Sequence, residues 1–206
     1  MTGKSPKSNP SVRSTETSFR IIEQIQASEG ASLTELAETV DVSKSTVHNH
    51  LQTLCGLDYV VKEGDEYRIG LRFLKLGHQA RNRYNLYHVA KSEVGNLVES
   101  IGERVQIMVE EDGVGIYIYQ SLADQAVKTD SHIGTVVNLH ATAVGKAYLA
   151  HLPDEEQAEL LDKIDLSEET PNTITERASL ESELEKVQEQ GYAFNDEERT
   201  VGMRAV

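Results

Sequence analysis

Cysteine, tryptophan and proline are scarce in this chain: 206 residues contain one Cys, no Trp and four Pro. A single cysteine cannot form an internal disulfide or a cysteine-rich metal site, so we expect Cys55 to be a small, buried apolar residue. The chain has no run of 18 apolar residues, and its first residues include no apolar segment of the kind found in secretory signals. These absences predict a cytoplasmic protein without a membrane span.

Positive charge is scarce too, but only in one half of the chain. The net charge is −14, yet residues 1–83 hold 11 Lys and Arg against 10 Asp and Glu, whereas residues 84–206 hold 9 against 24. This asymmetry predicts two domains with different partners. Acidic residues without a single acidic tail also suit a protein kept soluble in a high-salt cytoplasm. In such a setting DNA binding would depend on base edges, shape and dimeric binding more than on phosphate contacts.

Residues 32–54 have the pattern of two short helices joined by a tight turn. Apolar residues recur at helical spacing over 33–40, after a capping box formed by Ser32 and Glu35. Ser43 caps a second helix, which buries Val47, Leu51 and Leu54 and is followed by Gly56 at its C-terminal end. The pattern fits a helix-turn-helix, and it equally fits a helical hairpin with a solvated polar face.

The flanking segments favour the helix-turn-helix. Phe19, Ile22 and Ile25 mark a preceding helix, and two β-prone runs around a Gly64-Asp65 turn predict a hairpin after the second helix. This order predicts a winged helix-turn-helix over residues 18–70. Residues 1–17 are expected to form a disordered tail, from which three basic residues could approach phosphate (Lys4, Lys7 and Arg13).

Residues 71–86 are predicted to form a linker helix with too few apolar positions for independent stability. We expect its leucines (Leu71, Leu74 and Leu76) to pack on a second copy of the helix or on the next domain, which predicts a dimer.

From residue 87 onward the pattern predicts an α+β domain with helices on one face of its sheet. Its expected helices are 88–100 (Val94, Leu97, Val98 and Ile101 inward), 140–151, 153–164 and 179–190, and its expected strands are 104–110, 115–121, 130–136 and one starting at 192.

Catalytic chemistry finds little support in the sequence. His132, His140, His151 and the acidic run 196–198 could be offered as acid–base or metal-binding groups. However, the chain has no HExxH motif, nucleophile elbow, P-loop or Gly-rich dinucleotide motif. We therefore expect no catalytic residues, no metal site and no cofactor.

The order of features resembles the isocitrate lyase regulator (IclR) family of transcription factors. The resemblance runs from about residue 19 to the end, through the stretches LTELAETVDVSKSTVHNHLQTL, YRIGLRFLKLG, LHATAVGKAYLAHLP, TITERASLESELEKVQEQGYAFNDEE and VGMRAV. It implies a winged helix-turn-helix, a linker helix and a GAF-like effector domain. Such proteins are usually dimers or tetramers that repress or activate genes in response to a small molecule, often an organic acid or an aromatic compound. The alternative is an architectural or constitutive DNA binder whose second domain only oligomerises.

In such a fold the second helix of the helix-turn-helix is expected to contact DNA. Hydroxyls and backbone N–H groups of its first turn would bind phosphate, and Asn49 could form a bidentate pair with adenine. The predicted DNA-binding residues are Lys44, Ser45, Thr46, His48 and Asn49 on this helix and Lys62 and Arg68 on the hairpin.

The effector site is expected at the helix start around Ala143, Val144 and Gly145, where small residues would expose N–H groups to an anion. Close helix–sheet packing explains the same small residues equally well. The resemblance also places Asn195 and Ala205 near the ligand, at positions where many relatives carry an acidic residue and a cysteine. Relatives continue past Val206, so we expect an incomplete effector domain or an open sheet edge.

Overall fold

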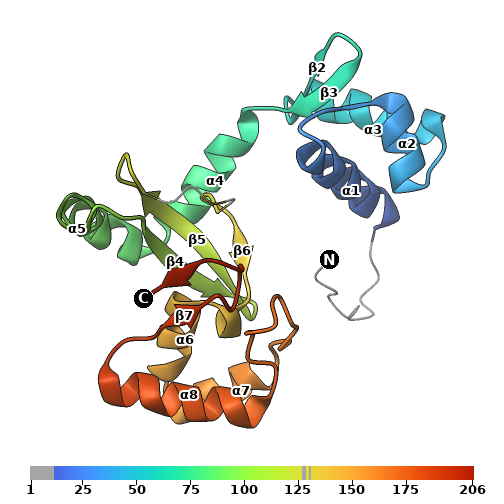
Figure 1. The fold of residues 1–206 in the computed structure, drawn as a ribbon. Helices are drawn as coiled ribbons and strands as arrows, with labels where there is room; N and C mark the ends of the chain where they lie inside the picture. Colours follow the sequence, from blue (N-terminus) through green and yellow to red (C-terminus); the bar gives the residue numbers. More distant parts are fainter. Residues whose placement is uncertain (1–11, 127–128, 130) are drawn as a thin grey trace. The chain divides into compact units, whose positions relative to one another are not determined.

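The computed structural model describes residues 12–126, 129 and 131–206. The chain divides into two compact units, Met1–Arg83 and Tyr84–Val206 (Figure 1). Within the described residues, none of the helices is long and apolar enough to cross a membrane.

The first unit begins with α1 (Arg13–Ala27), which starts earlier than expected. The predicted disordered tail is therefore wrong for residues 13–17, while Lys4 and Lys7 lie outside the described residues. The buried face of α1 consists of Ile21 and Ile25, whereas Phe19 is 55% exposed, so the predicted face was also partly wrong. The three Ser and Thr residues of 14–17 do not stop the helix, because helix propensity is only a weak prior.

The predicted helix-turn-helix is present. Helix α2 (Leu33–Val40) begins with the Ser32–Glu35 capping box, and α3 (Lys44–Gly56) begins at the Ser43 cap. Val47, Leu51 and Leu54 are buried against α1 and α2, as expected. Gly56 is the last residue of α3 rather than a left-handed cap, and the left-handed conformation falls on Asp58 instead.

The wing consists of β2 (Val60–Glu63) and β3 (Glu66–Ile69), joined at the predicted Gly64-Asp65 turn. A third strand, β1 (Ala31–Ser32), pairs with β3 and was not predicted, because two residues carry no strand periodicity. Cys55 is half-buried beside this core rather than fully buried, and burial raises the pKa of its thiol.

Helix α4 (Arg72–Asn82) follows the wing and is shorter than the predicted linker of 71–86. None of its residues is buried, and Leu71 before it is 81% exposed, with Leu74 at 68%. The three leucines are therefore exposed in a single copy of the chain, whereas Phe73 is half-buried against the Tyr59 ring.

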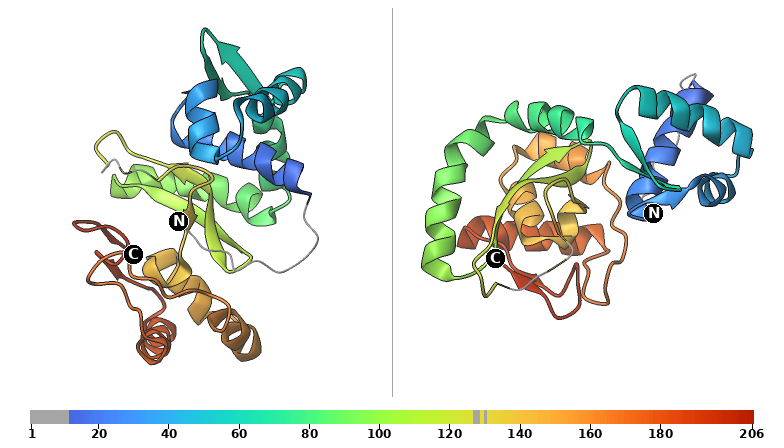
Figure 2. Two further views of the ribbon diagram at one scale, coloured as in Figure 1. Left: turned by 90° about the vertical axis from the view of Figure 1, so that its right-hand side faces the viewer. Right: turned by 90° about the horizontal axis from the view of Figure 1, so that it is seen from above.

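The second unit is a three-layer arrangement around an antiparallel sheet of order β4-β5-β6 (Figures 1 and 2). The strands are β4 (Val105–Glu111), β5 (Val114–Ser121) and β6 (Val136–Val137). The strand predicted over 130–136 was wrong for residues 131–135, which are not in a strand, and residue 130 lies outside the described residues. Its first helix, α5 (Asn85–Ile101), covers one face. The remaining helices cover the other face: η1 (Leu139–Ala141), α6 (Ala143–Ala150), α7 (Asp154–Leu161) and α8 (Arg177–Gln190).

Helices on both faces contradict the prediction of helices on one face. Val109 and Ile118 point to α5, whereas Met108 and Tyr117 point to α6, because side chains alternate along each strand. On α5, Val94 and Val98 are buried as expected, but Leu97 and Ile101 are 45% and 51% exposed, so these two predicted inward positions were wrong.

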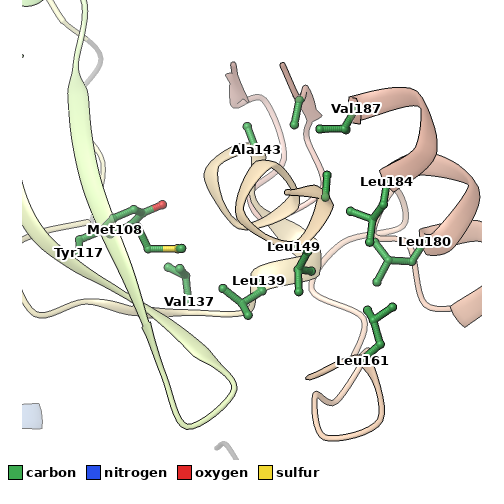
Figure 3. Packing of buried hydrophobic residues seen from close by; sticks show 12 residues of the cluster. Met108, Tyr117, Val137, Leu139, Ala143, Leu149, Leu161, Leu180, Leu184 and Val187 are labelled. Atoms are coloured by element: carbon green, nitrogen blue, oxygen red, sulfur yellow. The ribbon is translucent and has the colours of Figure 1, made fainter. Parts of the chain in front are cut away.

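The larger core lies between the sheet and the helices of the second face (Figure 3). Leu139, Ala143 and Leu149 stand between Met108 and Tyr117 of the sheet and the buried leucines of α8. A two-stranded ladder of β7 (Asn195–Asp196) and β8 (Arg204–Ala205) follows α8. This core fixes α6, whose first turn was predicted to hold the effector.

Candidate DNA-binding surface and effector domain

The outer face of α3 presents a set of polar side chains. Lys44, Ser45, His48 and Asn49 are exposed, while Thr46 is half-buried. The Ser43 hydroxyl accepts a hydrogen bond from the Thr46 backbone N–H (3.2 Å), which orients the first turn. The Lys44 ammonium donates to the Thr34 hydroxyl (3.1 Å), so the lysine is held near the start of α2.

Two contacts missed by sequence reasoning hold α1 against the helix-turn-helix. The Ser18 hydroxyl bonds to His50 Nδ1 of α3 (2.8 Å), and the Arg20 guanidinium donates to the Val40 carbonyl at the end of α2 (2.7 Å). No local pattern predicts these contacts, since each joins residues 20 or more positions apart. They join α1 to both helices of the helix-turn-helix.

The two basic residues of the wing differ in their surroundings. Arg68 contacts the carboxylates of Glu63 (3.2 Å) and Glu66 (2.8 Å) and donates to the Glu29 carbonyl (2.8 Å). Lys62 is exposed, with its ammonium 5.6 Å from the centre of the Tyr67 ring. Thus Arg68 already ties the wing to the segment after α1, whereas the Lys62 ammonium has no carboxylate within 4.0 Å among the described residues.

In the second unit, the start of α6 is tightly packed. The Thr142 hydroxyl accepts from the Gly145 N–H (3.1 Å), whereas the N–H groups of Ala143 and Val144 have no acceptor within the described residues. Ala143 is 4% exposed and Val144 is half-buried. A Cβ on Gly145 would lie 2.2 Å from the Leu139 carbonyl oxygen, so this glycine is required by close backbone packing.

Asn195 and Ala205 are brought together, since they face each other across β7 and β8. Asn195 is buried, its amide nitrogen donates to the Ala141 carbonyl, and its amide oxygen accepts from the Glu198 N–H (3.2 Å). Both ends of the Asn195 side chain are therefore engaged by the backbone. Ala205 is exposed and offers only a methyl group.

A buried ion pair lies one turn beyond the start of α6 and was missed by sequence reasoning. Lys146 is 1% exposed, and its ammonium contacts Glu198 at 2.7 Å and Glu183 of α8 at 3.5 Å. The other Glu198 carboxylate oxygen, Oε2, is buried without a hydrogen bond from the described residues. Position 146 lies three residues after Ala143 and four before Ala150, both buried, and this helical spacing was the available signal.

The three histidines considered for catalysis are not gathered into one site. His132 and His151 are exposed, His140 is fully buried, and the described residues contain no group of three potential metal ligands. His140 contacts the Ser167 carbonyl through Nε2 (3.1 Å). Burial lowers the pKa of His140, opposed by this hydrogen bond and by the charges of Glu169, Asp165 and Glu198.

The lowered pKa of His140 predicts a pH dependence of stability. In the unfolded chain His140 binds a proton near its ordinary pKa of about 6.5. In the folded chain the lowered pKa means that protonation requires a lower pH. The contribution of this residue to the free energy of unfolding is therefore complete above about pH 6.5 and decreases as the pH falls toward the folded pKa. Urea unfolding between pH 5 and 8 should show a weaker pH dependence for His140→Gln than for the native chain. His151→Gln is the control, and equal slopes for the two variants would contradict the prediction.

Comparisons with known proteins agree with this architecture. The family model described as "IclR helix-turn-helix domain" matches residues 14–64, and "Bacterial transcriptional regulator IclR C-terminal" matches residues 78–206. A probable HTH-type transcriptional regulator ArcR of Halobacterium salinarum is 33% identical over 90% of this chain and 72% of its own length. The transcriptional repressor IclR of Escherichia coli is 30% identical over 95% of this chain and 73% of its own length.

The fold matches as well. A crystal structure of the Thermotoga maritima IclR superimposes with a TM-score of 0.77 at 29% identity, covering 93% of this chain and 78% of that one. These relatives are transcriptional regulators rather than enzymes, in agreement with the expected absence of catalysis. With a helix-turn-helix in one unit and an IclR C-terminal domain in the other, this chain belongs to the IclR family of DNA-binding transcriptional regulators.

Proposed function

We propose that α3 reads base edges of a double-stranded DNA operator through His48 and Asn49, and that a small organic acid or aromatic compound bound by the second unit controls this contact. The observation that carries the proposal is the exposed polar face of α3, a capped helix whose opposite face is buried in the core. Repression is the proposed output, as in the name of the E. coli relative.

The proposed roles on α3 follow from position. Lys44, Ser45 and Thr46 lie in the first turn, where hydroxyls, backbone N–H groups and the helix dipole favour phosphate. His48 and Asn49 lie one turn on, and the Asn amide can donate to and accept from one adenine edge. On the wing, Lys62 is the stronger phosphate candidate, because the Arg68 guanidinium is already shared between Glu63 and Glu66.

The proposed effector seat is the first turn of α6. The N–H groups of Ala143 and Val144, which have no acceptor among the described residues, support it, because they favour an anion at the helix start. Three further residues would shape the seat rather than contact the ligand. Gly145 is packed against the Leu139 backbone, the Asn195 side chain is hydrogen-bonded to backbone groups, and Ala205 offers only an exposed methyl group.

We further propose a cytoplasmic homodimer or tetramer in which α4 pairs through its exposed leucines. Two helix-turn-helix units must lie about one DNA turn apart to read both half-sites, which a paired linker would allow.

A constitutive DNA binder, in which the second unit only oligomerises, is the second candidate. The engaged side chain of Asn195 and the packed Gly145 favour it. Saturable binding of a small molecule that changes operator affinity would exclude it, because such a protein has no coupling free energy between two sites.

The base-reading role of Asn49 is testable with a selected operator. Asn49→Ala should weaken specific binding by about 1–3 kcal/mol, roughly 5- to 150-fold, and relax the preference at one base pair. Titration of labelled DNA at fixed salt measures the loss. Gln52→Ala, a neighbouring exposed position on α3, serves as a control for general effects of the helix surface. Unchanged affinity and unchanged base preference in Asn49→Ala would refute the assignment.

A further inference from the structure

Most positive charges of the second unit are already neutralised by carboxylates. Within the described residues, Lys146, Lys163, Arg177, Lys186 and Arg204 each lie within 4.0 Å of an Asp or Glu oxygen. Arg199 has no such partner there, although the unit carries 24 acidic residues. A half-buried cation without a carboxylate in so acidic a domain requires an explanation.

Arg199 is directed at a buried hydroxyl instead. Its Nη1 donates to the Ser131 hydroxyl (2.9 Å), and Ser131 is 6% exposed. The Ser131 N–H donates to the Thr129 hydroxyl (3.2 Å), which also accepts from Nη1 of Arg104, the residue before β4. Two guanidinium groups from distant parts of the sequence are thus linked through Thr129 and Ser131.

The charges of both arginines affect the Tyr117 phenol of β5. Burial raises the pKa of its phenol, while the positive charges of Arg199 and Arg104 oppose the rise and that of the Glu169 carboxylate adds to it. The Glu169 carboxylate is itself held by the Asn138 amide (2.8 Å). Tyr117 also belongs to the core that contains Ala143, on the α6 side of the sheet (Figure 3).

The group that best matches this arrangement is an anion. Arginine offers five N–H donors in a planar fork, which suits the paired oxygens of a carboxylate or phosphate, and Arg199 uses one of them on a neutral hydroxyl. A partly buried guanidinium also binds an anion more strongly than a fully solvated one does.

We propose that the Arg199 guanidinium and the Ser131 hydroxyl, held in place by the link from Ser131 through Thr129 to Arg104, form an anion-binding site for the carboxylate or phosphate group of a small molecule. One part of this proposal rests on the proposed function, namely that the bound anion is the effector. Binding of the anion itself does not require DNA. The residues that form and support the site lie at positions 104, 129, 131 and 199, far apart in the sequence, so the site forms only in the folded unit.

Calorimetric titration of the full chain at constant ionic strength, without DNA, tests the site. The probes are inorganic phosphate and benzoate, with neutral benzamide as the matched control for the aromatic ring. We expect saturable binding of at least one anion and none of benzamide. Binding of phosphate alone would identify a free phosphate or phosphorylated ligand, and binding of benzoate alone a carboxylic acid. Absence of binding by both anions would overturn the proposal.

The decisive variant is Arg199→Gln, compared with Lys163→Gln, which removes the same charge from an exposed lysine of the same unit. Arg199→Gln should weaken anion binding at least about tenfold, whereas Lys163→Gln should stay within about twofold of the native chain. Equal affinities would overturn the proposal. If Arg199→Gln does not fold, Arg199→Lys and Ser131→Ala replace it, and native affinity in both would overturn the proposal too. Should the anion bind without changing operator affinity, the site stands and effector control fails.

Discussion

Replacing Lys146 by methionine is expected to lower the free energy of unfolding of the second unit by about 3–5 kcal/mol. Methionine fills a similar volume, so the loss comes from charge rather than from packing. With the ammonium gone, Glu198 keeps a buried carboxylate without its cation, and its Oε2 already lacks a hydrogen bond from the described residues. Urea unfolding followed by far-UV circular dichroism measures the change.

The double variant Lys146→Met with Glu198→Gln supplies the control. Removing both charges should recover part of the stability, because the uncompensated carboxylate is gone, and the coupling between the two changes should be about 0.5–3 kcal/mol. Lys163→Gln, at an exposed ion pair, should change the free energy of unfolding by less than about 1 kcal/mol. A Lys146→Met chain as stable as the native one would mean that Glu198 gains solvent or another partner.

The second large effect is expected at Gly145. A Cβ there would lie 2.2 Å from the Leu139 carbonyl oxygen and 2.6 Å from the Leu139 Cα, both of them backbone atoms that cannot move aside cheaply. Gly145→Ala should therefore cost about 1–3 kcal/mol or more in the unfolding of the second unit. Gly95→Ala in α5 is the matched control: beyond the adjacent residues and the neighbouring helix backbone, its Cβ would meet no described atom within 4 Å, so alanine should be neutral or stabilising by up to about 1 kcal/mol.

The Gly145 result also separates the two explanations for small residues at the start of α6. Strong destabilisation would assign the glycine to packing between η1 and α6. Native stability combined with lost binding of a small acid would instead assign it to the approach of a ligand, contrary to the geometry described above.

The first unit could be predicted well because its signals are local. The Ser32–Glu35 capping box and the Ser43 cap each lie within four residues of what they stabilise, and the Gly64-Asp65 turn lies between the strands that it joins. Such features depend on the sequence within a few positions. The predicted polar face of α3 is accordingly exposed as expected.

The second unit was predicted less completely because its decisive contacts are long-range. The residues that engage Asn195, Lys146 and Arg199 lie 54, 52 and 68 positions away. Hydrophobic periodicity identified α5 but did not show that helices cover both faces of the sheet. The apolar residues of such short strands are compatible with a sheet buried on one face or on both. The small residues of α6 likewise gave no sign that this helix contains a buried charged residue, Lys146.

The buried pair of Lys146 also constrains the order in which the second unit can form during synthesis. Glu198 leaves the ribosome 52 residues after Lys146, and Glu183 leaves 37 residues after it. Until the later segment arrives, α6 cannot dock on the sheet without burying a cation lacking its main partner, which is strongly unfavourable. The first unit, which ends at Arg83, is free to fold while the nascent second unit waits for Glu198.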